Sequence, residues 1–250
     1  MSQHRTFANR LRQFFWPQSL CPVCGQLLDG CGLCDKCQEL LAQQNLCLYC
    51  PTIIPQGTVV CRECASGIEN PFLQGVSGFT YEGRLRNNIL NFKYHNKPEL
   101  HRPLALLLRD LVERRLVRQD FDLLLAVPVS EQTMERRGYN HMQLVADALA
   151  SELKLNTAPK ALRRIKNTRK LNKLTRAERE KELEGAFVAE AELVRGKYVL
   201  LVDDIFTTGA TARACSGALL AAGSEAVYLA TLASAVLNSN CNSPKPQGRT

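Results

Sequence analysis

The chain has 250 residues, 45% of them hydrophobic and 22% charged, with a formal net charge of +8. This length and composition suffice for one α/β domain with a buried core and one small additional module. No apolar stretch reaches the about 18 residues that span a bilayer, and the start of the chain lacks the apolar region and cleavage site of a signal peptide. We therefore expect a cytoplasmic protein without an integral membrane segment.

The N-terminal segment, residues 1–19, is predicted to form a short amphipathic helix that Pro17 ends. Binding to a membrane surface and packing against the rest of the chain are both open for its apolar face. The absence of a lipidation motif favours packing. The apolar face carries Phe7, Leu11, Phe14 and Phe15.

Residues 20–70 are rich in cysteine and poor in large apolar residues, so a hydrophobic core alone would not fold them. Four C-x-x-C pairs follow one another at short and nearly equal intervals. Each C-x-x-C turn directs two thiolates toward one point, and two turns complete a tetrahedral sulfur site that leaves zinc no open position for catalysis. Consecutive pairing predicts a double zinc ribbon with two structural sites, one made by Cys21, Cys24, Cys34 and Cys37 and the other by Cys47, Cys50, Cys61 and Cys64.

A disulfide framework is the main alternative for these cysteines, and it would need an oxidising compartment that nothing in the sequence indicates. A redox C-x-x-C is usually a single motif beside a βαβ unit rather than one of four. Cys31 also stands three residues before Cys34, so the second pair could be Cys31 with Cys34. The even intervals favour Cys34 with Cys37.

Residues 71–237 alternate between strand-like and helix-like segments, which is typical of a parallel sheet covered by helices on both faces. The tail, residues 238–250, is predicted to be disordered. Apolar periodicity predicts strands near 76–81, 123–129, 198–202 and 226–232, and helices near 84–94, 99–117, 139–153 and 210–222.

Positive charge is concentrated between Lys160 and Lys181. This segment holds ten Lys or Arg and two acidic residues, a net charge that equals that of the whole chain. A local basic segment suits a local anion: the phosphates of a small ligand, a nucleic acid backbone or an acidic partner. A solvated basic loop is the alternative.

The most specific stretch runs from Tyr198 to Thr211 and reads YVLLVDDIFTTGAT. An apolar strand leads into two carboxylates and then into a Thr/Gly-rich turn that opens a helix. Helix N-termini bind phosphate through free amides and the positive end of the helix dipole. Gly209 permits close approach of the backbone, and Thr207, Thr208 and Thr211 add hydroxyl donors.

The paired acids Asp203 and Asp204 would repel a phosphate unless hydroxyl groups or a metal lay between them. A ribose 5-phosphate meets this condition, because its phosphate enters the turn while its 2′ and 3′ hydroxyls reach the acids. The absence of a Walker lysine and of G-x-G-x-x-G excludes an ordinary P-loop and a dinucleotide site. A plain helix cap at Thr207 or Thr208 is the structural alternative, and it leaves the paired acids unexplained. Since acids facing a cleft lie outside the core, we expect their substitution by Asn to change fold stability little.

The stretch VLLVDDIFTTGAT resembles the signature loop of type I phosphoribosyltransferases. With the cysteine pairs, NFKYHNKPEL, VPVS followed by RRGYNH, and LTRAERE with GAF, the chain more narrowly resembles ComF family proteins, which are associated with competence for DNA uptake. The resemblance runs from FFWPQSLCPVCG to about Ser234. It implies a type I phosphoribosyltransferase-like α/β fold preceded by a zinc-ribbon module.

The resemblance also implies a ligand, the magnesium complex of 5-phosphoribosyl pyrophosphate or a related sugar phosphate. The loop after VPVS would contact the pyrophosphate, and the basic segment near 166–184 would close over the site. The ligand-binding residues would be Asp203, Asp204, Thr207, Thr208, Gly209, Ala210, Thr211, Val129, Ser130, Lys170 and Lys173.

Three positions depart from the family pattern and leave efficient catalysis open: His141, Leu171 and Glu182. The family favours Gln at the first, Gln near the second and Asn near the third. Leu171 and Glu182 fall in the expected closing loop. For His141 we favour a helix-start role over proton transfer.

Two function classes follow. In the first, an enzyme transfers phosphoribose to an unknown acceptor through a transition state that resembles a ribosyl cation. Mg²⁺, Arg136, Arg137 and closing-loop lysines would neutralise the pyrophosphate, while Asp203 and Asp204 orient the sugar. In the second, a non-catalytic module uses the zinc ribbons and the basic loop to contact single-stranded DNA or a competence partner.

Overall fold

The computed structural model describes residues 19–28, 30, 32–95, 97–117, 120–166 and 175–235. Apart from Ser19, the expected N-terminal helix lies outside these residues, and so do the tail, Cys31, Lys170, Leu171 and Lys173. The described elements are β1 Ser19–Leu20, β2 Leu27–Leu28, α2 Asp35–Gln43, α3 Arg62–Ala65, β3 Gln74–Thr80, α4 Gly83–Tyr94, η1 Pro98–Leu100, α5 His101–Arg115, β4 Leu123–Ala126, α6 Glu131–Arg137, α7 His141–Leu153, β5 Leu162–Arg164, α8 Arg176–Leu183, β6 Phe187–Ala189, α9 Ala191–Val194, β7 Tyr198–Phe206, α10 Ala210–Ala221 and β8 Ala226–Ser234.

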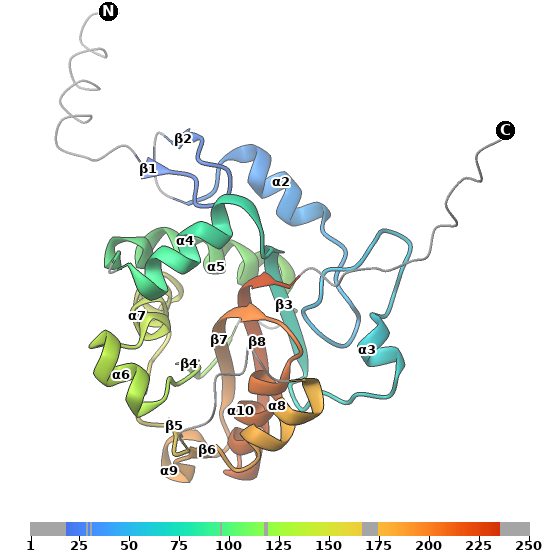
Figure 1. Cartoon of the computed structure of the whole chain (residues 1–250), viewed down its shortest axis with the longest axis vertical. Helices are drawn as coiled ribbons and strands as arrows, with labels where there is room; N and C mark the ends of the chain where they lie inside the picture. The colour runs from blue at the N-terminus through green and yellow to red at the C-terminus, as the bar shows by residue number, and fades with distance from the viewer. Residues whose placement is uncertain are drawn as a thin grey trace, which may run out of the picture.

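The centre of the molecule is a four-stranded parallel sheet with the strand order β3-β8-β7-β4 (Figure 1). Two antiparallel pairs, β1 with β2 and β5 with β6, lie outside it. The four central strands correspond to the four predicted from apolar periodicity. Helices flank the sheet, and the cysteine-rich segment precedes it, so the predicted fold class is confirmed.

Both faces of the sheet are buried, as expected for strands that are apolar at consecutive positions. Leu200 and Val202 of β7 face a core with α4, α5 and α7. Val199 and Leu201 face a second core with α8 and α10. Side chains of the cysteine-rich segment join both cores: Leu41 of α2 the first, and Ile54 the second.

The strand β7 is longer than the sequence predicts. Its ladder with β8 continues from Tyr198 opposite Ala226 to Phe206 opposite Ser234. Asp203 and Asp204 therefore lie inside the strand, and only residues 207–209 form the turn before α10. The expected strand end at 202 was too early because β8 is equally long and continues to offer backbone partners past the apolar run that ends at Val202.

The helices α6 and α8 were not predicted. The seven residues of α6 bury none of their side chains, so they show no apolar periodicity. The helix α8 does have a start signal, since Thr175 and Glu178 form a capping box. Among the described residues, no helix has both the length and the apolar character needed to cross a membrane.

Candidate phosphate-binding site and cysteine groups

The candidate site lies at the carboxyl ends of β4 and β7, which are neighbouring parallel strands. Here a cavity of about 280 Å³ is bordered by the segment after β4 and by the turn after β7. Carboxyl ends of parallel strands are where ligands bind in open α/β sheets. The residues that line the cavity are Lys93, Val127, Pro128, Val129, Ser130, Thr133, Arg137, His141, Met142, Arg164, Asp203, Asp204, Ile205, Thr207 and Thr211.

The turn after β7 presents an open helix N-terminus. Gly209 is the N-cap of α10 with φ of 77°, and within the described residues no side chain forms a capping hydrogen bond there. The plain helix cap at Thr207 or Thr208 is thus not what the structure contains. The first amides of α10 remain available as donors at the positive end of the helix dipole.

The two acids of β7 differ sharply in their surroundings. Asp204 is 7% exposed, and its Oδ2 lies 2.7 Å from Lys93 Nζ and 2.6 Å from His141 Nε2. Asp203 is half-buried and lines the cavity, and its Oδ1 accepts a hydrogen bond of 2.8 Å from the Asp204 amide. Within the described part of the chain, no Lys or Arg forms an ion pair with Asp203.

These surroundings drive the pKa values of the two acids apart. Burial and the neighbouring Asp204 charge raise the pKa of Asp203 to about 8. Burial would also raise the pKa of Asp204, but Lys93 and the His141 hydrogen bond outweigh it and hold this pKa well below its ordinary value. Burial would lower the pKa of Lys93, yet the Asp204 carboxylate raises it. Asp204 is therefore a fixed, paired carboxylate, and Asp203 faces the ligand space.

His141 connects Asp204 to an arginine. Arg137 Nη1 donates to His141 Nδ1 at 3.1 Å, which leaves the Nε2 proton for Asp204. Burial lowers the pKa of His141 despite the hydrogen bond with Asp204, so the imidazole is neutral. The Arg137 guanidinium also stacks over the Tyr94 ring at 4.8 Å, and its buried Nε has no hydrogen-bond partner among the described residues. The Arg137 side chain borders the cavity, so its guanidinium lies beside the space that an anion would occupy.

Of the other predicted site residues, some line the cavity and others do not. Val129, Ser130, Thr207 and Thr211 line the cavity, whereas the exposed Arg136 does not. Thr208 and Gly209 lie in the turn after β7, and Ala210 is the first residue of α10.

Lys93, His141 and Arg164 were not predicted as site residues. A signal existed for the first two, since Lys93 lies in NFKYHNKPEL and His141 in RRGYNH, stretches that carry the family resemblance.

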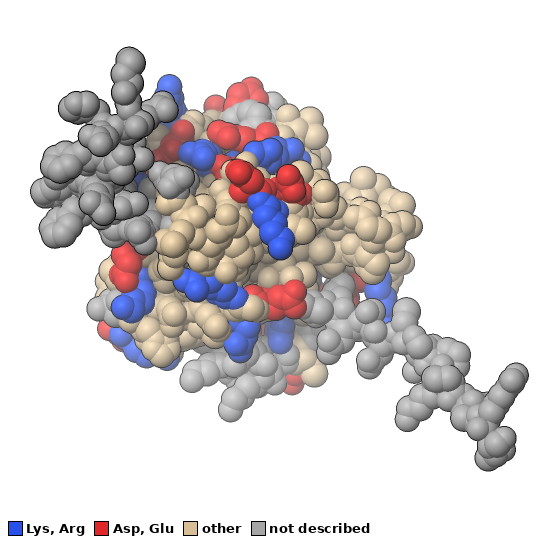
Figure 2. All heavy atoms as spheres, turned by 90° about the horizontal axis from the view of Figure 1, so that it is seen from above, with Lys and Arg blue, Asp and Glu red and all other residues tan. Residues whose placement is uncertain are grey.

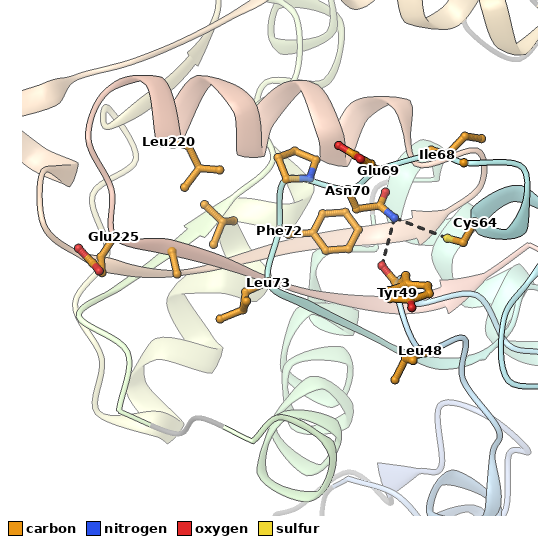
Figure 3. Close-up of a pocket in the computed structure, with 14 residues that line it drawn as sticks. Leu48, Tyr49, Cys64, Ile68, Glu69, Asn70, Phe72, Leu73, Leu220 and Glu225 are labelled. Atoms are coloured by element: carbon orange, nitrogen blue, oxygen red, sulfur yellow. Dashed lines mark hydrogen bonds between the residues drawn. The ribbon is translucent and has the colours of Figure 1, made fainter.

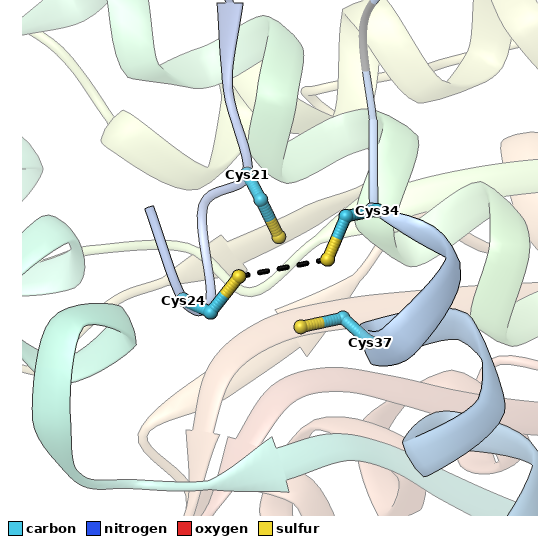
Figure 4. A group of neighbouring side chains, drawn as sticks. All are labelled: Cys21, Cys24, Cys34 and Cys37. Atoms are coloured by element: carbon cyan, nitrogen blue, oxygen red, sulfur yellow. Dashed lines mark hydrogen bonds between the residues drawn. The ribbon is translucent and has the colours of Figure 1, made fainter. Parts of the chain in front are cut away.

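The eight paired cysteines form two groups of four. In the first group, Cys21 and Cys24 lie on a turn, Cys34 is the N-cap residue of α2, and Cys37 lies within α2 (Figure 4). The Cys24 and Cys34 sulfurs are 3.5 Å apart.

The second group repeats this plan with a turn at Cys47 and Cys50 and with Cys61 and Cys64 at α3. In each group all four sulfurs lie within 4.8 Å of one another. A tetrahedron with Zn–S bonds of about 2.3 Å separates its sulfurs by about 3.8 Å. The donor sets therefore fit zinc, and Cys37 fills the position for which Cys31 was the alternative.

The parallel sheet with helices on both faces and a strand–turn–helix unit at its carboxyl edge defines an α/β protein. The DNA utilization protein YhgH of Escherichia coli (strain K12) is 29% identical over 162 residues, which are 64% of this chain and 71% of that protein. Competence protein F of Haemophilus influenzae is 30% identical over 59% of this chain and 66% of its own length. Competence protein ComFC of Bacillus subtilis is 27% identical over 67% of this chain and 68% of its own length. These relatives support the assignment to the ComF family that the sequence predicts.

Two solved structures show a looser similarity. A glutamine phosphoribosylpyrophosphate amidotransferase from B. subtilis matches with a TM-score of 0.39 and 21% identity over 57% of this chain and 30% of its own. Adenine phosphoribosyltransferase from Thermoanaerobacter pseudethanolicus matches with a TM-score of 0.32 and 16% identity over 51% and 77%. No protein-family model matches the chain.

Proposed function

We propose that this protein binds the magnesium complex of 5-phosphoribosyl pyrophosphate in the cavity between β4 and β7. The 5-phosphate binds the amides and hydroxyls from Thr207 to Thr211. The ribose hydroxyls donate to Asp203. The pyrophosphate lies toward Val129, Ser130 and Arg137.

One observation carries this proposal: an uncapped helix N-terminus and a half-buried carboxylate border the same cavity. A phosphate alone would be repelled by the ionised form of Asp203, and a sugar alone would not need the amides of α10. A phosphorylated sugar uses both. Asp204 is paired with Lys93 and His141, which supports our proposal that Asp203 makes the hydroxyl contacts while Asp204 holds the site together.

The same residues suit transfer of phosphoribose to an acceptor. Mg²⁺ bound to the ligand would supply positive charge to the leaving pyrophosphate. Arg137 adds a cation and an unused donor on that side, whereas the exposed position of Arg136 assigns it no contact. Asp203 fixes the ribose and favours the positive charge that develops on it. The basic segment, whose residues 167–174 fall outside the described part of the chain, would exclude water by closing over the site.

We further propose that each cysteine group holds one structural zinc ion. Four sulfurs leave no position for water, so the metal serves the fold. Backbone amides support the thiolates, since the Cys61 amide donates to Cys47 Sγ at 3.3 Å.

A thermal-shift series tests the ligand. We expect 5-phosphoribosyl pyrophosphate with Mg²⁺ to raise the melting temperature more than ribose 5-phosphate or pyrophosphate does alone, because it engages both halves of the cavity. Equal shifts for pyrophosphate and the full ligand would reject the ribose contacts. Release of pyrophosphate when nucleobases are added would establish catalysis.

Binding of single-stranded DNA or of a competence partner is the second candidate, favoured by relatives named for DNA utilization and competence. On the face shown in Figure 2, basic and acidic side chains are interspersed rather than gathered by sign. On this face a nucleic acid backbone would meet charges of both signs, and the basic segment is our candidate for its contact. Salt-sensitive retention on single-stranded DNA that is lost when Lys170 and Lys173 become Gln would support this candidate.

A further inference from the structure

Residues 66–73 link the second cysteine group to β3, and we call them the linker. They pass directly beside the turn after β7, residues 207–209, which we call the phosphate turn. The Phe72 ring meets the Phe206 ring edge-on, with centroids 6.5 Å apart. A Cβ added to Gly209 would lie 2.7 Å from the Phe206 ring and 2.7 Å from Arg213 Nη1. The backbone of the turn is thus in contact with two side chains, Phe206 and Arg213, and the linker lies behind both.

Arg213 is held from two sides. Its Nη2 donates to Glu180 Oε1 at 2.8 Å, and its Nη1 makes a long hydrogen bond of 3.5 Å to Asn70 Oδ1. Glu180 belongs to α8, which follows the basic segment, and Asn70 belongs to the linker. The guanidinium that contacts Gly209 is therefore placed by groups outside the phosphate turn.

Asn70 in turn is bound to the second cysteine group. Its Nδ2 donates to the Tyr49 carbonyl at 3.1 Å and to Cys64 Sγ at 3.7 Å (Figure 3). Asn70 and Phe72 also border a cavity of about 610 Å³. On that side the linker has open space, so the hydrogen bonds of Asn70 add to the burial of Phe72 in fixing its position.

We propose that Asn70 and Arg213 are positioning residues for the phosphate turn, and that through them the second cysteine group sets the affinity for the phosphorylated ligand. The proposal rests on the proposed function for its ligand. The first cysteine group has no such route among the described contacts, since Cys21, Cys34 and Cys37 pack into the core on the α4 and α5 side. The two cysteine groups thus have different roles.

The first group offers a matched control. Gln38 is also a side-chain amide next to a cysteine group, and its Oε1 accepts a 2.9 Å hydrogen bond from Arg114. Its Nε2 donates to the Leu33 carbonyl at 3.1 Å. Gln38→Ala removes an amide–arginine contact of the same kind on the other side of the sheet.

Hydrogen exchange of the ligand-free, zinc-loaded full chain tests the positioning without any ligand. In Asn70→Ala and Arg213→Met we expect the peptide over residues 206–213 to exchange about three- to tenfold faster than in the wild type, as loss of one hydrogen bond permits. Gln38→Ala should leave it unchanged. Faster exchange over the whole molecule, or no change in Asn70→Ala, would overturn the proposal.

Calorimetry with 5-phosphoribosyl pyrophosphate and Mg²⁺ gives the second readout. The dissociation constant should rise about three- to tenfold in both positioning variants and stay constant in Gln38→Ala. If the wild type does not bind this compound, the proposed function fails while the exchange result still judges the positioning. Normal affinity in both variants of a binding protein would reject the link to the ligand.

Discussion

Asp203 lines the candidate cavity, and its surroundings there disfavour the ionised form of its carboxyl group. Because its pKa is raised to about 8, the folded chain keeps a proton between about pH 4 and pH 8 that the unfolded chain releases. The free energy of unfolding therefore falls as the pH rises through this window. Such a cost is common where residues are arranged for binding rather than for stability.

Asp203→Asn removes this cost. We expect the variant to be more stable than the wild type at pH 8 and to lose most of that advantage at pH 5. Urea unfolding at both pH values measures it. Glu192→Gln, a change at an exposed acid in α9, is the control and should give parallel curves. An Asp203→Asn curve that also runs parallel to the wild type would contradict the assigned burial.

Asp204 requires a correction to the expectation that both acids lie outside the core. Its carboxylate is buried between Lys93 and His141, so Asp204→Asn leaves the Lys93 ammonium, 16% exposed, without its counter-charge. Breaking such a pair costs about 3 kcal/mol of unfolding free energy. The two acids of the signature thus differ: Asp204 is part of the structure, and Asp203 is the one that we propose for binding.

A double-mutant cycle measures this coupling. Asp204→Asn should be strongly destabilised, and adding Lys93→Met should recover part of the loss because it removes the unpaired charge. Urea unfolding of the four proteins gives the coupling energy. Additive effects of the two substitutions would mean that Lys93 and Asp204 do not depend on each other.

At the scale of elements, the turn between β7 and α10 depends on Gly209. Gly209→Val introduces a Cβ at a φ of 77° and places it against Phe206 and Arg213. Ligand binding should be lost, with a measurable decrease in melting temperature.

Gly217→Ala, in the same helix, is the control for this prediction. A Cβ there meets open space, so we expect normal binding and equal or higher stability. Binding by Gly209→Val at wild-type affinity would show that the ligand does not approach this backbone.

The elements that carry strong apolar patterns could be predicted, and those defined by long-range contacts could not. The four central strands and the phosphate turn follow from local sequence. The extension of β7 past Val202 depends on its partner β8. The contact of His141 with Asp204 joins positions 63 residues apart, and no local pattern indicates it. The capping box at Thr175 is a local signal that would have identified α8.

At the scale of the whole molecule, the cysteine groups are tied into the cores on both sides of the sheet. We expect two zinc ions per chain by elemental analysis of protein purified under reducing conditions. Cys37→Ser should lower the count to about one, because it removes a ligand of one group only. Cys215→Ala, which changes a buried cysteine outside both groups, should keep two. A count near zero in the wild type would reject the zinc assignment.

The binding cavity is likewise a property of the whole molecule, since α4, α6, α7, β7 and α10 all contribute to it. The sequence predicted the turn after β7 on one side of this cavity and Val129, Ser130 and Arg137 on the other. The chain of contacts from Arg137 through His141 to Asp204 came only from the structure.

Calorimetric titration with 5-phosphoribosyl pyrophosphate and Mg²⁺ tests the central claim most directly. At about pH 9, where Asp203 is ionised, the wild type should bind one ligand per chain, and Asp203→Asn, while fully folded, should bind it about one to two powers of ten more weakly, because a charged hydrogen-bond acceptor is lost. No binding by the wild type, or an unchanged dissociation constant in Asp203→Asn, would contradict the assignment of this cavity to a phosphorylated ribose.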